Sequence, residues 1–350
     1  MMTAHILIVY TGGTIGSVED PETGSLRPLD FEQLKRQIPE LDRLSASVEV
    51  ETLDPLDSSD MGPKQWVELA ELLYERREFF DGFVVLHGTD TMAYTASALS
   101  FMLLGFAKPV VLTGSQLPIG VLRTDGKENF LTAVEIAAHR TPDPHTDEDF
   151  PTLQEVAVYF GDDLFRGNRT HKHSAEDFHA IGSSNYPALA EVGVNLRFRD
   201  EALLRSTSPA TLATQLDSNV LVIHLVPGLS SAALAHQFET PGLRAVVMRT
   251  YGSGNAPSNI GFVSVIQAAI ERGLVVVNVS QCSTGSVDPD RYATGRSLAA
   301  TGVIPALDMT LESAVTKLMV LAGQHPTTEA LAASFRLNIA GEQTDHGKLL

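Results

Sequence analysis

The stretch "FVVLHGTDTMAYTAS", residues 83–97, decides the fold. It begins with four apolar residues in a row, without the polar alternation of a half-exposed strand, which is typical of a strand that a parallel sheet buries on both faces. The polar turn "GTDT" then leads into a helix. Strand, turn and helix in this order form the unit of a parallel α/β sheet, so we expect the turn at the carboxyl end of a buried strand.

Similar short runs, rich in β-branched residues, recur along the chain, and stretches with helical spacing separate most of them. The runs span residues 5–10, 48–53, 109–114, 155–160, 220–225, 245–250 and 274–279, and helical stretches include 64–80 and 259–273. This alternation predicts an α/β fold with a mainly parallel sheet covered by helices on both faces. With 350 residues, of which 43% are hydrophobic, the chain can fill two cores.

The chain divides where strand character is lost. Residues 196–218 lack it and precede a new strand–helix series. We therefore predict a larger N-terminal catalytic α/β domain over 1–200, a linker over 201–218 and a smaller C-terminal parallel α/β domain over 219–350. The Pro- and Asp-rich stretch 139–151 is expected to be a surface loop.

Composition excludes several classes of function. The chain has 25 Lys and Arg against 43 Asp and Glu, a formal charge of −18, which argues against nucleic acid and anionic membranes because both are bound through phosphate neutralisation. The single Cys282 excludes an intrachain disulfide and a multi-cysteine metal site. The N-terminal apolar run is short and lacks a basic region before it, so we interpret it as a first strand and expect a cytoplasmic protein.

Polar turns follow the first four apolar runs. They are "TGGTIG" (11–16), "DPLDSSDM" (54–61), "GTDTM" (88–92) and "GSQLP" (114–118). The carboxyl ends of parallel strands lie at one edge of a sheet, where α/β proteins bind their ligands. We therefore expect these four turns to face one crevice.

The turn "TGGTIG" favours hydroxyl chemistry over phosphate binding. It lacks the Lys-Ser/Thr pair of a phosphate loop, and Thr11 stands where a dinucleotide fingerprint has its first glycine. Gly12 and Gly13 permit a tight turn and close approach of a ligand. Thr14 could then be a nucleophile activated by a base, with nearby N–H groups stabilising an oxyanion; the alternative is an ordinary turn or cap residue.

Two other turns offer hydroxyls and carboxylates. Thr89 and Asp90 lie where a strand meets a helix; Asp90 alone would be a helix cap, but a cap does not require the second hydroxyl. Ser58 and Ser59, with the N–H groups beside them, suit a small carboxylate, although such stretches also form ordinary Asx or Ser turns.

The basic stretch "FRGNRTHKHSAEDF" (165–178) could supply a proton acceptor. His171 and His173 do not share a helical face and no further Cys or His ligands accompany them, so we expect no metal site. Lys172 could serve as a base in a desolvated crevice; the alternative is a lysine exposed on the surface.

Together these motifs resemble the bacterial L-asparaginase family, and specifically its cytoplasmic type I branch. The resemblance runs from residue 5 to about 340 and rests on the matching stretches 11–16, 57–61, 86–103, 108–116, 166–172, 251–259 and 292–295.

The resemblance implies hydrolysis of the side-chain amide of L-asparagine to L-aspartate and ammonia through an acyl-enzyme. On the family pattern, Thr14 is the nucleophile, and Thr89, Asp90 and Lys172 form the second catalytic group. Ser58 holds the substrate α-carboxylate. Which of the two threonines attacks first stays open.

Further roles follow from the same resemblance. Asp90 and Ser59 lie near the α-ammonium, and the backbone N–H groups of Thr14 and Thr89 form the oxyanion hole. No cofactor is expected. The family assembles as a homodimer or a dimer of dimers in which the C-terminal domain of one subunit closes the site of its neighbour, and Asn255 is our candidate for that contact.

The sequence departs from the family in the loop after the nucleophile. The family places a tyrosine there, whereas this chain has Ser25 in "TGSLRP" (23–28) and no tyrosine between Tyr10 and Tyr74. If that tyrosine helps to activate the threonine, Ser25, another group or a water must replace it here, and turnover could be lower.

The type I branch includes enzymes with a second, allosteric asparagine site. Arg249 and Cys282 match its pattern, but His171 stands in place of the expected threonine. For Cys282 the alternative is a buried small side chain beyond a strand.

Three other functions compete with asparagine hydrolysis. L-Glutamine is one methylene longer than asparagine and could be a weaker substrate. The asparaginase-like subunit of tRNA-dependent amidotransferases has an additional N-terminal domain, whereas ten residues precede Thr11 here. A non-catalytic amino-acid sensor would not need two hydroxyls and a lysine together.

Overall fold

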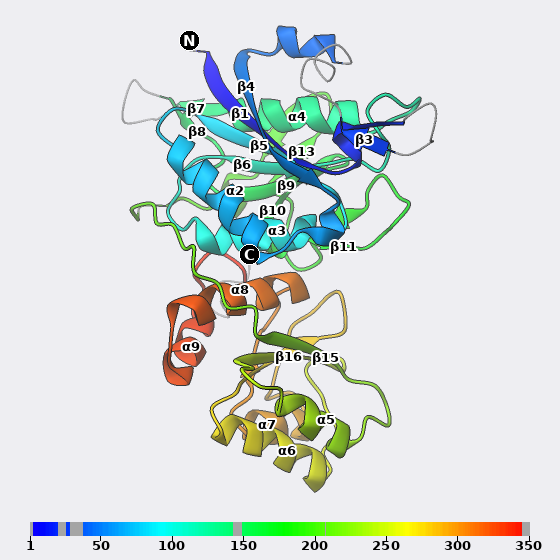
Figure 1. The fold of residues 1–350 in the computed structure, drawn as a ribbon, viewed down its shortest axis with the longest axis vertical. Coiled ribbons are helices and arrows are strands. Elements are labelled where there is room, and N and C mark those ends of the chain that lie inside the picture. Colours follow the sequence, from blue (N-terminus) through cyan, green and yellow to red (C-terminus); the bar gives the residue numbers. More distant parts are fainter. Residues whose placement is uncertain (1–2, 20–25, 29–37, 143–148, 207, 345–350) are drawn as a thin grey trace. The chain divides into compact units, whose positions relative to one another are not determined.

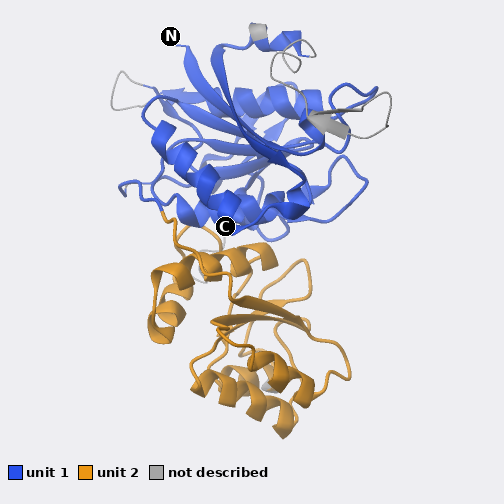
Figure 2. Cartoon of the chain, in the orientation of Figure 1, with its two compact units in different colours: residues 1–212 blue, residues 213–350 orange. Residues whose placement is uncertain are grey.

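The computed structural model describes residues 3–19, 26–28, 38–142, 149–206 and 208–344 (Figure 1). The chain forms two compact units, residues 1–212 and 213–350 (Figure 2). Each unit contains a sheet with parallel strands and its own helices. The predicted two-domain α/β fold is confirmed.

The described part of the N-terminal unit contains an eight-stranded sheet. In sheet order the strands are β14 (Leu196–Phe198), β13 (Ala190–Val192), β10 (Asp163–Arg166), β9 (Val156–Phe160), β6 (Val110–Thr113), β5 (Gly82–Leu86), β1 (Ala4–Gly12) and β4 (Ala46–Leu56). The five strands from β9 to β4 are mutually parallel, and β10, β13 and β14 continue the sheet in antiparallel pairs.

Helices cover both faces of the parallel strands. Figure 1 shows α4 (Gly126–Ala138) on one side of the sheet and α2 (Pro63–Arg76) and α3 (Met92–Met102) on the other. Residues of β5 are therefore buried along its whole length, as the unalternating run "FVVL" predicts. Alternate residues of β1, such as Ile6 and Ile8, pack with α4 in one core cluster.

Short elements join these strands. They are the 3₁₀ helices η1 (Thr14–Gly16), η2 (Pro39–Arg43), η3 (Ser58–Asp60), η4 (Gly167–Arg169) and η5 (Asp200–Ala202), and the strand pairs β2 (Ser17–Glu19) with β3 (Leu26–Pro28), β7 (Arg140–Pro142) with β8 (Asp149–Pro151), and β11 (His171–Lys172) with β12 (Ile181–Gly182). Two expectations are corrected. The two ends of the predicted loop 139–151 pair as antiparallel strands, and residues 196–198 form an edge strand because they pair with β13.

The C-terminal unit contains a parallel four-stranded sheet in its described residues. Its strands are β15 (Val220–His224), β16 (Ala245–Thr250), β17 (Val275–Ser280) and β18 (Ile304–Pro305), and its helices are α5 (Ser231–Phe238), α6 (Ile260–Glu271), α7 (Ala293–Ala299), α8 (Leu311–Gln324) and α9 (Thr328–Phe335).

An ion pair lies inside this unit. Lys317 on α8 and Glu342 beyond α9 contact each other, and both side chains are 0% exposed. Lys317 also donates to the carbonyl of Phe335 at 2.9 Å, and Glu342 accepts the N–H of Ala340 at 2.7 Å. The pair thus joins α8 to the segment that follows α9.

Candidate active site

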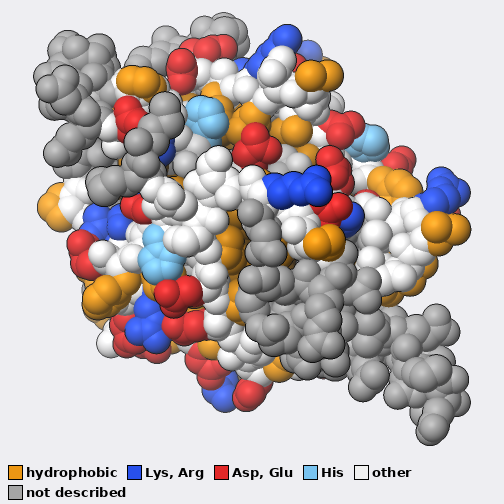
Figure 3. All heavy atoms as spheres, turned by 90° about the horizontal axis from the view of Figure 1, so that it is seen from above, with side chains coloured by type: hydrophobic (Ala, Val, Ile, Leu, Met, Phe, Trp, Pro, Cys, Tyr) orange, Lys and Arg blue, Asp and Glu red, His pale blue; other side chains and the backbone are white. Residues whose placement is uncertain are grey.

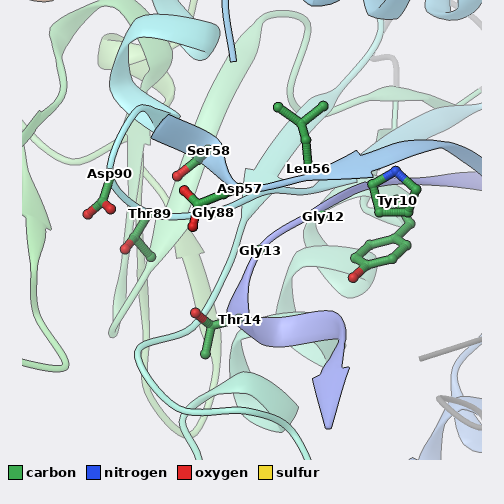
Figure 4. A pocket seen from close by; sticks show the side chains of 11 residues that line it. Tyr10, Gly12, Gly13, Thr14, Leu56, Asp57, Ser58, Gly88, Thr89 and Asp90 are labelled. Atoms are coloured by element: carbon green, nitrogen blue, oxygen red, sulfur yellow. The ribbon is translucent and has the colours of Figure 1, made fainter. Parts of the chain in front are cut away.

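A pocket lies at the carboxyl end of β1, the strand on whose two sides β4 and β5 are added to the sheet. The chain passes from β1 to β4 on one side of β1 and then to β5 on the other side, so the turns that follow these strands diverge there. The pocket has a volume of about 300 Å³ (Figure 4). It is lined by Tyr10, Gly12, Gly13, Thr14, Pro55, Leu56, Asp57, Ser58, Gly88, Thr89 and Asp90.

Three of the four polar turns expected to face one crevice line this pocket. The fourth, residues 114–118, lies against the third, because a Cβ on Gly114 would be 3.5 Å from Thr89 Cγ2. Its backbone is held by Asp125, whose carboxylate accepts the N–H of Gln116 at 2.9 Å. The fourth turn therefore supports the site without being part of the lining.

Glycines allow the three lining turns to touch at their backbones. A Cβ on Gly12 would lie 2.1 Å from the carbonyl oxygen of Leu56, and one on Gly13 would lie 2.4 Å from the backbone nitrogen of Gly88. Gly12 and Gly13 have φ values of +115° and +87°, in the region that favours glycine. A Cβ on Gly88 would in turn lie 2.6 Å from Ser58 Oγ. A larger residue at any of these positions would separate the turns.

We expect Gly13→Ala to destabilise the N-terminal unit by about 2–4 kcal/mol, because it combines a positive φ with a backbone overlap. Trp66, the single tryptophan of the chain, is buried in this unit, so urea unfolding followed by its fluorescence reports on the unit alone. Gly193→Ala is the matched control, since no atom lies within 4 Å of the added Cβ. Equal unfolding midpoints for the two variants would contradict the close packing of the turns.

Thr14 begins η1, directly after the two glycines, and its side chain is half-buried. Figure 4 shows it on one side of the pocket, with Ser58, Thr89 and Asp90 arranged around the rest. Its hydroxyl makes no hydrogen bond to any residue that the structure describes. The hydroxyl is therefore available to a ligand in the pocket.

Lys172 reaches the pocket from β11. Its Nζ donates to Thr89 Oγ1 at 2.8 Å and to Asp90 Oδ1 at 2.5 Å. The lysine side chain is 17% exposed, whereas that of Asp90 is 66% exposed. The alternative of a surface lysine is therefore wrong, and the structure brings these three predicted residues together at the rim of the pocket.

Ser58 is buried in the wall of the pocket and is held by its neighbours. The Thr91 hydroxyl donates to the Ser58 carbonyl at 2.6 Å, which ties the Ser58 turn to the turn that carries Thr89. Ser59 lies outside the lining, and both its N–H and its hydroxyl donate to Asp57 at 2.8 Å. These two bonds, the backbone one first, lower the pKa of Asp57.

Two groups at the site were not singled out from the sequence. Asp57 lines the pocket, and its position directly before Ser58 in one turn was the available signal. His87 is completely buried behind Gly88; its Nδ1 lies 2.7 Å from the Gly88 carbonyl and its Nε2 lies 2.9 Å from Thr95 Oγ1. Burial lowers the pKa of His87 to about 4.

This pKa predicts how stability depends on pH. The folded imidazole stays neutral down to about pH 4, whereas the ordinary value of 6.5 applies to the unfolded chain. The contribution of His87 to the free energy of unfolding is therefore fully present above pH 6.5. It falls by about 3 kcal/mol as the pH drops towards 4. We would compare urea unfolding of wild type and His87→Gln across this range. Gln does not titrate, so equal pH slopes would contradict the assignment.

The other predicted residues are not among those that line this pocket. Arg249 and Cys282 belong to the C-terminal unit and His171 to the N-terminal unit, and their role stays a prediction. The alternative of a buried Cys282 is wrong: the thiol is exposed in a turn beyond β17, where the Cys282 N–H donates to Ser280 Oγ at 3.0 Å. Ser25 lies outside the described residues.

Asn255 also belongs to the C-terminal unit. Its Oδ1 accepts the Thr294 hydroxyl at 2.7 Å, and its backbone pairs with Tyr251.

The surface carries charges of both signs. On the face shown in Figure 3, Asp and Glu side chains are interspersed with Lys and Arg, without an extended basic patch among the described side chains. Within the described ranges, no group of three or more His, Cys, Asp or Glu is placed to hold a metal. No helix of the described chain is both long and apolar enough to span a membrane.

Comparisons with known proteins agree with one another over nearly the whole chain. Two family models match, "Asparaginase, N-terminal" over residues 5–204 and "Glutaminase/Asparaginase C-terminal domain" over residues 219–335. L-asparaginase 1 of Escherichia coli K12 is 40% identical, over 98% of this chain and 99% of its own. The human 60 kDa lysophospholipase is 39% identical, over 91% of this chain and 58% of its own. The crystal structure of L-asparaginase I from Vibrio cholerae matches with a TM-score of 0.87 at 36% sequence identity. The match covers 98% of this chain and 100% of the Vibrio cholerae chain.

Proposed function

The chain belongs to the asparaginase family, and on that premise we propose that it hydrolyses the side-chain amide of L-asparagine to L-aspartate and ammonia. The family predicted from the sequence motifs is the family that both models match. The observation that carries the proposal is the group formed by Lys172, Thr89 and Asp90 at the rim of the pocket that Thr14 also lines. Such a group can activate a hydroxyl for attack on an amide.

We propose Thr14 Oγ1 as the nucleophile. It attacks the side-chain carbonyl carbon of asparagine while its proton passes to a base, and the carbonyl oxygen becomes negative. The backbone N–H groups of Thr14 and Thr89 stabilise that oxygen. The C–N bond then breaks, nitrogen takes up a proton and leaves as ammonia, and a β-aspartyl ester remains. Water cleaves this ester to L-aspartate and restores the hydroxyl.

Lys172 is proposed to accept the proton through Thr89. A neutral lysine can accept the Thr89 hydroxyl hydrogen across the 2.8 Å separation, and the resulting ammonium is then stabilised by Asp90 at 2.5 Å. The same arrangement would serve if Thr89 attacked first. Substitution of each threonine separately, with detection of the trapped acyl-enzyme by mass spectrometry, distinguishes the two orders.

The pocket also offers groups for the amino-acid part of the substrate. We propose that Ser58 binds the α-carboxylate and that Asp90 binds the α-ammonium, since both line the pocket. L-Glutamine places its amide one methylene further from these groups. A methylene is worth about 1–3 kcal/mol in discrimination, so we expect glutamine to be hydrolysed more slowly.

The experiment that tests the function is the release of ammonia and L-aspartate by the purified protein at neutral pH. L-Asparagine and L-glutamine are compared over a wide concentration range. We expect equal amounts of both products from asparagine and a lower kcat/KM with glutamine. Binding of asparagine without release of ammonia would replace the hydrolase by an amino-acid sensor.

We further propose a homodimer or dimer of dimers in which Asn255 closes the site of the neighbouring subunit. The Asn255 carbonyl oxygen already accepts the Thr294 hydroxyl, so its NH₂ group would make the contact. The test is to mix two inactive variants, Thr14→Ala and Asn255→Leu, under conditions that exchange subunits. Recovery of activity supports a shared site, and its failure despite exchange contradicts it.

The second asparagine site is proposed not to operate, because the exposed His171 replaces the threonine of the family pattern. Saturation with asparagine should then be hyperbolic down to low concentration. A sigmoidal curve that becomes hyperbolic in Arg249→Ala would show that the second site works.

A further inference from the structure

A chain of buried hydrogen bonds runs from α2 through α3 to the turn after β5. The Trp66 indole N–H donates to Thr95 Oγ1 at 3.0 Å, and Thr95 Oγ1 lies 2.9 Å from His87 Nε2. His87 Nδ1 lies 2.7 Å from the Gly88 carbonyl oxygen. Trp66 is 4% exposed, and Thr95 and His87 are 0% exposed. This series of hydrogen bonds therefore leads from the interior to Gly88, a residue that lines the pocket.

The hydrogens in this chain can be assigned from its two ends. Indole N–H is only a donor and the Gly88 carbonyl is only an acceptor. His87 must therefore carry a hydrogen on Nδ1, and its Nε2, with a free lone pair, accepts the Thr95 hydroxyl hydrogen. Every group is satisfied with a neutral imidazole. The lowered pKa of His87 agrees with that protonation state.

The carbonyl that His87 holds belongs to the Gly88–Thr89 peptide group. In a trans peptide the C=O and N–H point in opposite directions within one plane. Fixing the Gly88 carbonyl towards the interior therefore points the Thr89 N–H away from His87. That N–H donates to no residue that the structure describes.

We propose that the Trp66–Thr95–His87 chain of hydrogen bonds positions the Gly88–Thr89 peptide group, so that the Thr89 N–H meets the substrate oxygen that becomes negative. The inference rests on the proposed amide hydrolysis, because it concerns buried residues that orient a backbone group of the same site. His87 is then a positioning residue that acts through the backbone. Gly88 has no side chain of its own to hold this peptide group, so the hydrogen bond from His87 contributes to its orientation.

The test separates binding from turnover in three variants and a matched control. His87→Gln removes the donor to Gly88, Thr95→Val removes the link to His87, and His87→Asn restores an amide N–H near the position of Nδ1. Removal of an oxyanion donor lowers kcat about 10²- to 10³-fold, so misdirecting one should lower it by about 10- to 100-fold. We expect that loss in His87→Gln and Thr95→Val, with KM for asparagine unchanged and partial recovery in His87→Asn.

Thr113→Val is the matched control. Thr113 is also fully buried in the N-terminal unit, and its hydroxyl donates to the Tyr159 carbonyl at 2.9 Å, outside the chain. Calorimetric titration with L-aspartate counts the molecules with an intact pocket, and Trp66 fluorescence confirms that the unit is folded. Turnover in this control should stay within twofold of wild type.

The outcomes distinguish the two proposals. No ammonia from wild type overturns the hydrolase and, with it, this inference. If the wild type is active and the kcat values of His87→Gln and Thr95→Val equal that of Thr113→Val, the positioning role is overturned and the hydrolase stands. A loss of turnover that follows a loss of aspartate-binding molecules, or a folded His87→Asn no faster than His87→Gln, would mean that the chain only stabilises the fold.

Discussion

Replacement of Thr14 by alanine is expected to lower kcat for asparagine by about four orders of magnitude, because removal of a nucleophile leaves only binding and oxyanion stabilisation. The fold should persist, since Thr14 is half-buried and its hydroxyl has no hydrogen-bond partner among the described residues. The measurement is ammonia release at saturating asparagine, with L-aspartate binding as the check on the pocket.

The control for this prediction is Thr14→Ser, which keeps the hydroxyl and loses only a methyl group. It should retain far more activity than Thr14→Ala. Near-normal turnover in Thr14→Ala would remove Thr14 from the nucleophile role and leave Thr89 as the candidate. Equal loss in both variants would point to a steric role for the methyl group.

The second large effect is expected at Lys172. Lys172→Met keeps the aliphatic stem and removes the amine, so Thr89 loses its hydrogen-bond partner while the pocket keeps its volume. We expect kcat to fall by about 10³-fold, within the range typical of general acid–base groups. Asp90, at 66% exposed, can be hydrated when its partner is removed, so the fold should be retained.

Lys127→Met provides the comparison. Lys127 is also a lysine of the N-terminal unit, and its Nζ lies 2.6 Å from a Glu40 carboxylate oxygen. Loss of this partly exposed pair should change turnover less than twofold, because such pairs contribute little and this one lies outside the pocket lining. If both lysine variants retained activity, the base would have to be another group.

Much of the site could be predicted because one rule covers it. Short apolar runs rich in β-branched residues identified the parallel strands, and parallel strands present their carboxyl ends at one edge. That is enough to gather Thr14, Ser58, Thr89 and Asp90, which the structure places in one pocket.

Lys172 falls outside that rule. It follows β10, where the sheet continues antiparallel, and it is separated from its partners Thr89 and Asp90 by more than 80 residues. Only the resemblance to a family indicated its position. The residues alone favour a surface lysine there. The observed position depends on how the chain crosses back after β10, which the residues do not specify.

The buried chain through His87 is not visible in the sequence. A histidine at the end of an apolar run carries no signal of its partners, and Thr95 appears as an ordinary helix residue. Their hydrogen bonds form only once α2 and α3 pack against the sheet. At Cys282 the prediction from residue type was wrong. Cysteine is usually buried, but the turn beyond β17 leaves this thiol exposed.

The Lys317–Glu342 pair has a consequence for shortening the chain. Both side chains are 0% exposed, and removal of one partner of such a buried pair costs about 3–5 kcal/mol. A protease cut or stop codon that deletes Glu342 would strand the Lys317 ammonium inside the C-terminal unit, although α9 itself would be complete. The residues that follow α9 therefore supply the carboxylate that neutralises the buried Lys317. An affinity tag should be added after these residues and should not replace them.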